Sequence, residues 1–220
     1  RKLIITDTQN GLKNGQQRTY TDMQDNGQLL FPSGGYRNLK SFQLAQLCFD
    51  ITVRFVELHI PPKSRTTDQM VQAARSGVQN IAEGSVASAT SKRTELKLTN
   101  VARASLEELR LDYEDYLRQH AITVWSKEHP LTQEFINQRI SSMEEFRTFV
   151  QNAKQHPSIS VSVHTCPLQS VIVANAVLLL LNVACHLLDR QLVRLAADFE
   201  NNGGFSERMY KRRLKKKEDI

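Results

Sequence analysis

Proline and glycine divide this chain into long uninterrupted stretches, and this punctuation limits what it can fold into. All six prolines lie between segments whose apolar residues recur at helical spacing. Five of the nine glycines fall within residues 1–35, and two more are adjacent, Gly203 and Gly204. Proline breaks helix interiors and glycine marks helix ends, so this distribution predicts long helices joined by short connections. The expected fold class is all-α.

The spacing of apolar residues predicts where the helices lie. Five are expected, at residues 38–60, 67–83, 91–119, 131–153 and 167–200. Asn38 is the expected N-cap of the first helix, and Thr66 with Gln69 forms an expected capping box at the second. The third has apolar residues at alternating spacings of three and four, the seam of antiparallel bundle packing. We therefore expect the first four helices to form an up-and-down four-helix bundle, with the long fifth helix docked against it.

The first expected helix carries two apolar stripes rather than one. One stripe consists of Leu39, Phe42, Ala45, Phe49, Val53, Val56 and Ile60, and the other of Leu44, Leu47, Ile51, Phe55 and Leu58. A helix with two apolar stripes must bury both. We predict that one packs inside the bundle and the other against another subunit or helix, which is a first indication of a homo-oligomer.

The chain divides into four regions. These are an N-terminal arm (1–35), the four-helix bundle (36–154), a C-terminal suffix helix (155–204) and a basic tail (205–220). The arm contains three Asn-Gly pairs between short β-prone pieces, and Asn-Gly is typical of the type I′ turn of a β-hairpin. Strands this short are not stable alone, so we expect an arm or a partly ordered extension.

The suffix segment is unusually apolar. Residues 155–188 contain no Asp, Glu, Lys or Arg, and 15 of the 18 residues from 171 to 188 are apolar. A membrane span and a centrally buried helix both fit this composition. One face carries a line of polar residues, Asn175, Asn182, His186 and Asp189. Such a line is costly on a lone span but can find partners in a bundle, so we expect a buried helix and no membrane.

No sequence pattern carries the chemistry of an enzyme or a metal site. The chain lacks a Gly-rich phosphate loop, HExxH, GxSxG and paired CxxC motifs, and its six histidines are scattered. The three cysteines, Cys48, Cys166 and Cys185, do not form a disulfide framework and fit a reducing compartment. Residues 1–20 lack the apolar core of a signal sequence. We expect a cytoplasmic protein without catalysis, cofactor or metal.

Positive charge concentrates at the C-terminal end of the chain. The net charge is +6, and residues 208–220 hold seven Lys and Arg against two acidic residues, a net +5. The seven cations are Arg208, Lys211, Arg212, Arg213, Lys215, Lys216 and Lys217. Together with Met209, Tyr210 and Leu214 they predict a short basic helix that contacts phosphates without reading bases. A solvated chain end is the alternative.

Further cations open the third expected helix. Lys92, Arg93 and Lys97 lie in its first two turns, where the helix dipole disfavours positive charge. An anionic partner such as phosphate explains this placement, and solubility alone is the other explanation. Arg75 on the second helix either serves the same surface or pairs with Glu83.

Most charge in the middle of the third helix is expected to neutralise itself. Arg103, Glu107, Arg110, Glu114 and Arg118 are spaced three or four residues apart, so each cation has a carboxylate one turn away. This pattern predicts a solvent-facing ladder of ion pairs rather than a binding surface.

Two segments carry a more specific pattern. They are MVQAARSGVQNIAEGS at 70–85 and TSKRTELKLTNVARASLEEL at 90–109. With the opening YRNLK at 36–40, they resemble the four-helix-bundle protein family. That family includes proteins encoded in intervening sequences of bacterial large-subunit rRNA genes and the accessory variability determinant of diversity-generating retroelements. The resemblance covers roughly residues 36–153, and the part from about 165 onward is similar to the C-terminal suffix segment of a longer subgroup.

This resemblance implies an up-and-down bundle that assembles as a ring-like homopentamer. In the retroelement members, the ring binds a reverse transcriptase and template RNA through basic surfaces and does not catalyse. The expected function is therefore a non-enzymatic, homo-oligomeric accessory protein that binds nucleic acid, RNA rather than DNA, with a reverse transcriptase as a candidate partner. Phosphate contacts are expected at Arg75, Lys92, Arg93, Lys97 and the tail. The alternative is a structural protein-interaction scaffold that binds no nucleic acid.

Overall fold

The computed structural model describes residues 30, 33–158 and 166–218. The elements are η2 (Gly35–Asn38), α1 (Lys40–His59), α2 (Arg65–Ala87), α3 (Lys92–Gln119), α4 (Pro130–Gln138), α5 (Met143–Ala153), α6 (Leu168–Asn202) and α7 (Phe205–Glu218). Within these described ranges there is no strand, so the all-α prediction is confirmed there. Most of the expected N-terminal arm, with its hairpin turns, lies outside the described residues.

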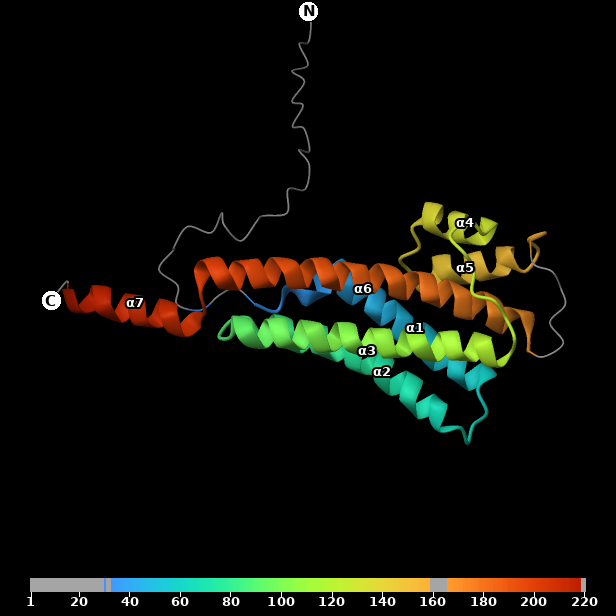
Figure 1. Ribbon diagram of the computed structural model, residues 1–220, viewed down its shortest axis with the longest axis horizontal. Coiled ribbons are helices and arrows are strands. Elements are labelled where there is room, and N and C mark those ends of the chain that lie inside the picture. Colours follow the sequence, from blue (N-terminus) through green and yellow to red (C-terminus); the bar gives the residue numbers. More distant parts are fainter. Residues whose placement is uncertain (1–29, 31–32, 159–165, 219–220) are drawn as a thin grey trace, which may run out of the picture.

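Four long helices, α1, α2, α3 and α6, lie side by side and alternate in direction (Figure 1). Helix α1 packs against α2 and α6, and α3 packs against the same two helices. Large side chains from different helices meet in their shared core, among them Phe55, Tyr113 and Ile172, each at most 2% exposed. We call these four helices the helical body.

Most residues of both apolar stripes of α1 are covered within a single chain, although Leu58 of the second stripe is 55% exposed. Phe42 and Val56 from one stripe and Leu47 and Phe55 from the other all belong to the hydrophobic core. This is so because α1 has a neighbour in α2 and another in α6. The second stripe therefore packs on another helix of the same chain, and the two stripes give no evidence for a second subunit.

The prediction of one helix at 131–153 is wrong, because this segment forms two short helices, α4 and α5. Arg139 ends α4 in the left-handed conformation, with φ 50°. Ser142 then begins α5 through a capping box: its Oγ accepts from the Glu145 N–H at 3.2 Å, and the Glu145 carboxylate accepts from the Ser142 N–H at 3.0 Å. The fourth long helix beside α1, α2 and α3 is therefore α6, and the expected bundle of residues 36–154 is corrected accordingly.

The helix starts differ slightly from the predicted caps. Helix α2 is capped by Ser64, whose Oγ accepts from the Thr66 N–H at 3.2 Å, so the capping box expected at Thr66 is wrong. Helix α1 is preceded by the 3-10 turn η2, and Leu39 takes the cap position expected for Asn38. At α2 a polar residue two positions before the expected cap satisfies one of the first backbone donors, whereas Leu39 makes no side-chain cap hydrogen bond at α1.

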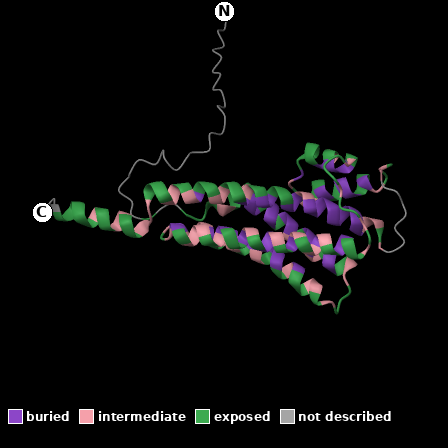
Figure 2. Ribbon diagram, in the orientation of Figure 1, coloured by how far each residue is buried: buried purple, intermediate pink, exposed green. Residues whose placement is uncertain are grey.

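The apolar part of α6 is covered by the rest of the protein. By length and composition this helix qualifies as a membrane span, but 72% of its most apolar window is buried inside the protein (Figure 2). Asn175, 1% exposed, accepts from the Trp125 N–H at 2.8 Å and donates to the Val171 carbonyl at 3.0 Å. Such pairing is typical of the core helix of a soluble protein. Of the expected polar line, Asn175 is buried, whereas Asn182, His186 and Asp189 are exposed.

Small residues bring α2 and α3 close together. A Cβ on Gly77 would lie 2.4 Å from Cδ2 of Leu106, so only glycine fits there without repacking the core. One position earlier, the hydroxyls of Ser76 and Ser105 lie 2.9 Å apart. These contacts fix the register of α2 against α3. They thereby position the turn between the two helices.

Candidate nucleic-acid interface

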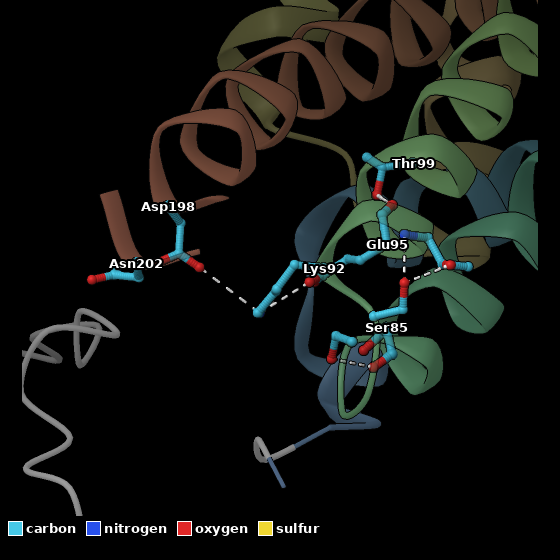
Figure 3. Close-up of polar contacts among 9 residues, drawn as sticks. Ser85, Lys92, Glu95, Thr99, Asp198 and Asn202 are labelled. Atoms are coloured by element: carbon cyan, nitrogen blue, oxygen red, sulfur yellow. Dashed lines mark hydrogen bonds and ion pairs between the residues drawn. The ribbon is translucent and has the colours of Figure 1, made fainter. Parts of the chain in front are cut away.

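Three parts of the chain meet at one end of the helical body: the turn between α2 and α3, the C-terminal end of α6 and the start of α7 (Figure 1). An ion-paired cluster joins the start of α3 to the end of α6 (Figure 3). Nζ of Lys92 lies 3.0 Å from Oε2 of Glu95 and 3.9 Å from Oδ2 of Asp198 on α6. The start of α3 is thus tied to the end of α6, the helix after which α7 begins.

Burial gives Lys92 a structural role. Its side chain is 6% exposed, and that of Glu95 is 12% exposed. Burial raises the pKa of Glu95, and the neighbouring ammonium of Lys92 acts in the opposite direction. A cation enclosed with two carboxylates does not present its charge to a phosphate outside. Lys92 is therefore removed from the set of predicted phosphate contacts.

The turn before α3 is held by its own hydroxyl groups. Oγ of Ser88 donates to the carbonyl of Ser85 at 2.7 Å, and Oγ of Ser91 accepts from the Thr94 N–H at 3.1 Å as the N-cap of α3. Figure 3 labels Ser85 of this turn near the Lys92 cluster. This cap satisfies one of the first backbone donors of α3. The exposed cations that follow therefore lie on a capped first turn.

The other cations singled out near the start of α3 are exposed. Arg93 and Lys97 lie four residues apart, which puts them on one face of the helix. Arg75 is also exposed, but the register at Gly77 places it about 15 Å further along the body. No ion pair joins Arg75 to Glu83, both of which are described. The structure thus brings Arg93 and Lys97 to the α7 end and leaves Arg75 apart.

Two glycines separate α7 from α6. Gly203 has φ 66°, a conformation that favours glycine, and it ends α6 as the sequence predicted. The Gly204 N–H then donates to the Glu207 carboxylate, which caps the start of α7. From there α7 extends beyond the end of the helical body (Figure 1).

The predicted basic helix is confirmed as α7, and it gathers all seven predicted tail cations. Five of them are exposed, Lys211, Arg213, Lys215, Lys216 and Lys217. Arg208 and Arg212 are half-buried and take part in interactions. The three lysines of the last turn also match the negative end of the helix dipole. Exposed charge of one sign on a projecting helix is suited to a polyanion.

Cations in the middle of α3 are paired with carboxylates, as the ladder prediction implied, although two partners differ. The pairs are Arg110 with Glu107 and Glu114, Arg118 with Asp115, and Arg103 with Asp189 of α6. Arg103 thus reaches across to another helix, and Arg118 pairs three residues back rather than four. These side chains neutralise each other and do not form a basic surface.

Two of the three cysteines, Cys48 and Cys185, are buried in the core. Burial raises the pKa of the Cys48 thiol and raises the pKa of Cys185 to about 11. Both thiols are therefore protonated at neutral pH and behave as core residues. Within the described ranges, no group of three or more His, Cys, Asp or Glu is arranged to hold a metal ion.

A cavity of about 640 Å³ lies between α1, α5 and α6, at the end opposite α7. Its walls include Phe55, Phe146 and Val173, and His59 lies among them. Burial lowers the pKa of His59, so the imidazole is neutral at pH 7. Charged side chains, among them Asp50, Arg54 and Arg147, also line this cavity, but it lies away from α7, so we place the candidate interface at the α7 end.

No protein-family model, no curated protein and no solved structure matches this chain. The case for function therefore depends on the residues and their geometry.

Sequence reasoning missed the contribution of α6 to the candidate interface. Asp198 takes Lys92 out of the basic surface, and Asp189 takes Arg103. Each pair joins residues far apart in sequence, and side-chain spacing within one helix carries no signal for such a contact.

Proposed function

We propose that this protein is a non-enzymatic, homo-oligomeric accessory protein that binds nucleic acid, RNA rather than DNA. The observation that carries the proposal is α7, a helix with seven cations and two acidic residues that projects beyond the helical body. A polyanion that contacts these cations releases its bound counterions, which is the main source of sequence-independent affinity. The basic residues of α7 would contact phosphates and not base edges.

Apart from Arg75, the proposed contacts lie at the α7 end of the helical body. Arg93 and Lys97 are exposed at the start of α3, which the Lys92 cluster ties to the end of α6. They would extend the basic surface of α7 onto the helical body. Arg75 is a more distant contact that a longer RNA would reach.

Self-association, as a ring-like pentamer, and a reverse transcriptase partner are parts of the proposal that come from the family resemblance. The alternating directions of α1, α2, α3 and α6 support an up-and-down bundle (Figure 1). Val101 and Leu111 on α3 are 37% and 52% exposed and offer apolar surface for contact between copies. The three free cysteines support a reducing, cytoplasmic location.

The test is a salt titration of RNA binding by the full chain and by a variant that lacks residues 205–220. We expect the RNA affinity of the full chain to fall steeply as the salt concentration rises. Removal of α7 should weaken binding and lower the slope of log affinity against log salt by about 1 for each phosphate that the truncated protein no longer binds. The matched control is Arg118→Gln, because Arg118 is exposed but paired with Asp115, distant from α7. This variant should bind like the full chain.

An unchanged slope after truncation rejects the proposed role of α7. A chain that binds a protein partner with little salt dependence and ignores RNA would instead be the structural scaffold. Sedimentation or native mass measurement of the same samples, with and without RNA, tests self-association. A single subunit under both conditions rejects the oligomeric part.

A further inference from the structure

The exposed face of α7 combines an aromatic ring with cations. Tyr210, Arg213, Leu214 and Lys217 follow a spacing of three, four and seven residues, so they share one face of the helix. Tyr210 is 64% exposed and Leu214 is 42% exposed, and both cations on this face are exposed.

The opposite face of α7 has the same pattern but is partly covered. Phe205, Arg208, Met209 and Arg212 repeat the order aromatic, cation, apolar, cation, and all four are half-buried. The face with Tyr210 is therefore the one that α7 presents to solvent. It is also the face available to a ligand.

Contacts within α7 do not account for this arrangement. Arg213 and Lys217 are like charges four residues apart, a pair that destabilises a helix. Neither has a carboxylate three or four residues away on the helix. The helix dipole favours Lys217 in the last turn, but it provides no reason for an exposed tyrosine one turn from Arg213. A ligand with both aromatic rings and negative charges would satisfy all three side chains.

We propose that this face binds single-stranded nucleic acid, with an unpaired base stacked on Tyr210 and flanking phosphates on Arg213 and Lys217. The inference rests on the proposed nucleic-acid function and adds the class of strand. In a duplex the base faces are covered by their neighbours, so only an unpaired base can stack on the phenol ring. Stacking of this kind tolerates any base and adds to the contribution of the phosphate contacts.

A lipid surface fits the same face less well. Helices that lie on membranes separate a broad apolar side from a basic side. In α7 only Tyr210 and Leu214 form the exposed apolar strip, and Arg213 and Lys217 lie within one turn of both. Burying that strip in lipid would carry the two cations toward the apolar layer.

The experiment measures the affinity of the full chain and of three variants for a short oligouridylate and for a short RNA duplex. Tyr210→Leu keeps an apolar side chain and a good helix former but removes the ring. It should weaken single-strand binding by about tenfold and change duplex binding by less than about twofold. Tyr210→Phe keeps the ring and should bind both ligands like the unmodified protein. Arg213→Gln should weaken binding to both ligands and lower the salt slope by about 1.

The outcomes separate the two proposals. If the unmodified protein binds RNA and Tyr210→Leu binds the single strand equally well, the stacking face is overturned and the proposed function stands. An equal loss on single strand and duplex also overturns it, because a stacked base would not be involved. If the unmodified protein binds phosphatidylserine vesicles but neither the oligouridylate nor the RNA duplex, both proposals fail and the face is a membrane contact. Circular dichroism of each variant checks that α7 is retained.

Discussion

Several cations in the helical body are paired with carboxylates, whereas most cations on α7 lie beside one another. Arg110 lies between Glu107 and Glu114 on α3, and Lys92 is enclosed by Glu95 and Asp198. On α7, residues 211–217 hold six cations and no acidic residue. A cation that is already paired offers little charge to a ligand, while the unopposed charges on α7 repel one another until an anion binds. Net charge alone would not reveal this difference.

Helices α6 and α7 also differ in what holds them in shape. The first half of α6 is buried continuously from Ser170 to Leu178, whereas α7 has no buried residue within its described part (Figure 2). Packing therefore stabilises α6, and α7 depends on its caps, its intrinsic propensity and the helix dipole. A 14-residue helix of that kind is marginal by itself, so we expect a bound polyanion to increase its helical order.

The largest expected effect comes from the core of α6. Ile172 is fully buried, so Ile172→Ala should lower the free energy of unfolding by about 2–5 kcal/mol through reduced burial and a residual cavity. The matched variant Leu214→Ala removes an exposed side chain of α7 and should change it by less than about 0.5 kcal/mol. Urea unfolding followed by circular dichroism measures both. Similar values for the two variants would contradict the contrast between packed α6 and unpacked α7.

A smaller difference in stability is expected between substitutions of two adjacent cations, Lys92 and Arg93. Lys92→Met leaves the carboxylates of Glu95 and Asp198 near each other without their cation, and should cost about 2–4 kcal/mol of stability. The exposed neighbour is the control: Arg93→Met should change stability by less than about 0.5 kcal/mol but weaken RNA binding.

Addition of Glu95→Gln to Lys92→Met should recover part of the stability, because the buried charge is then removed. If Lys92→Met instead keeps its stability and binds RNA more weakly, Lys92 is a phosphate contact and its structural role is wrong.

The smallest expected effect concerns Asp112, a carboxylate of the helical body that is not ion-paired with a cation. Burial, together with Glu108 and Asp115, raises the pKa of Asp112 to about 6, and its Oδ2 has no hydrogen-bond partner. The folded-state pKa lies above that of the unfolded chain, about 3.9, so the folded state binds the proton more tightly. Stability should therefore fall as pH rises from about 4 to about 6, and the loss should persist at neutral pH.

Asp112→Asn should remove this loss. After allowance for solvent screening, we expect a gain of about 1 kcal/mol at neutral pH that disappears near pH 4. Glu57→Gln serves as the control, since Glu57 is exposed and pairs with Arg54 on α1. It should change stability by less than about 0.5 kcal/mol at neutral pH. A gain from Asp112→Asn that is the same at both pH values would show that its ionisation is not the cause.

Periodicity predicted the helices but not every break between them. Gly203 and Gly204 marked the end of α6, and cation spacing marked α7, because both signals are local. The break between α4 and α5 also had a local signal, Ser142 followed three residues later by Glu145, which the continuous apolar pattern of 131–153 obscured. A capping box satisfies two backbone donors at once, and here it determines where the helix begins.

The sequence by itself determined the fold class of the described residues and the gathering of charge on a C-terminal helix. Both follow from interactions within a few residues: the periods of apolar and charged side chains, caps and glycine stops. Tertiary structure alone decided that α6 takes the place beside α1, α2 and α3, and that Lys92 is buried while Arg93 beside it is exposed. Those outcomes depend on contacts such as that of Lys92 with Asp198, which form only when helices distant in sequence pack together, so no local pattern contains them.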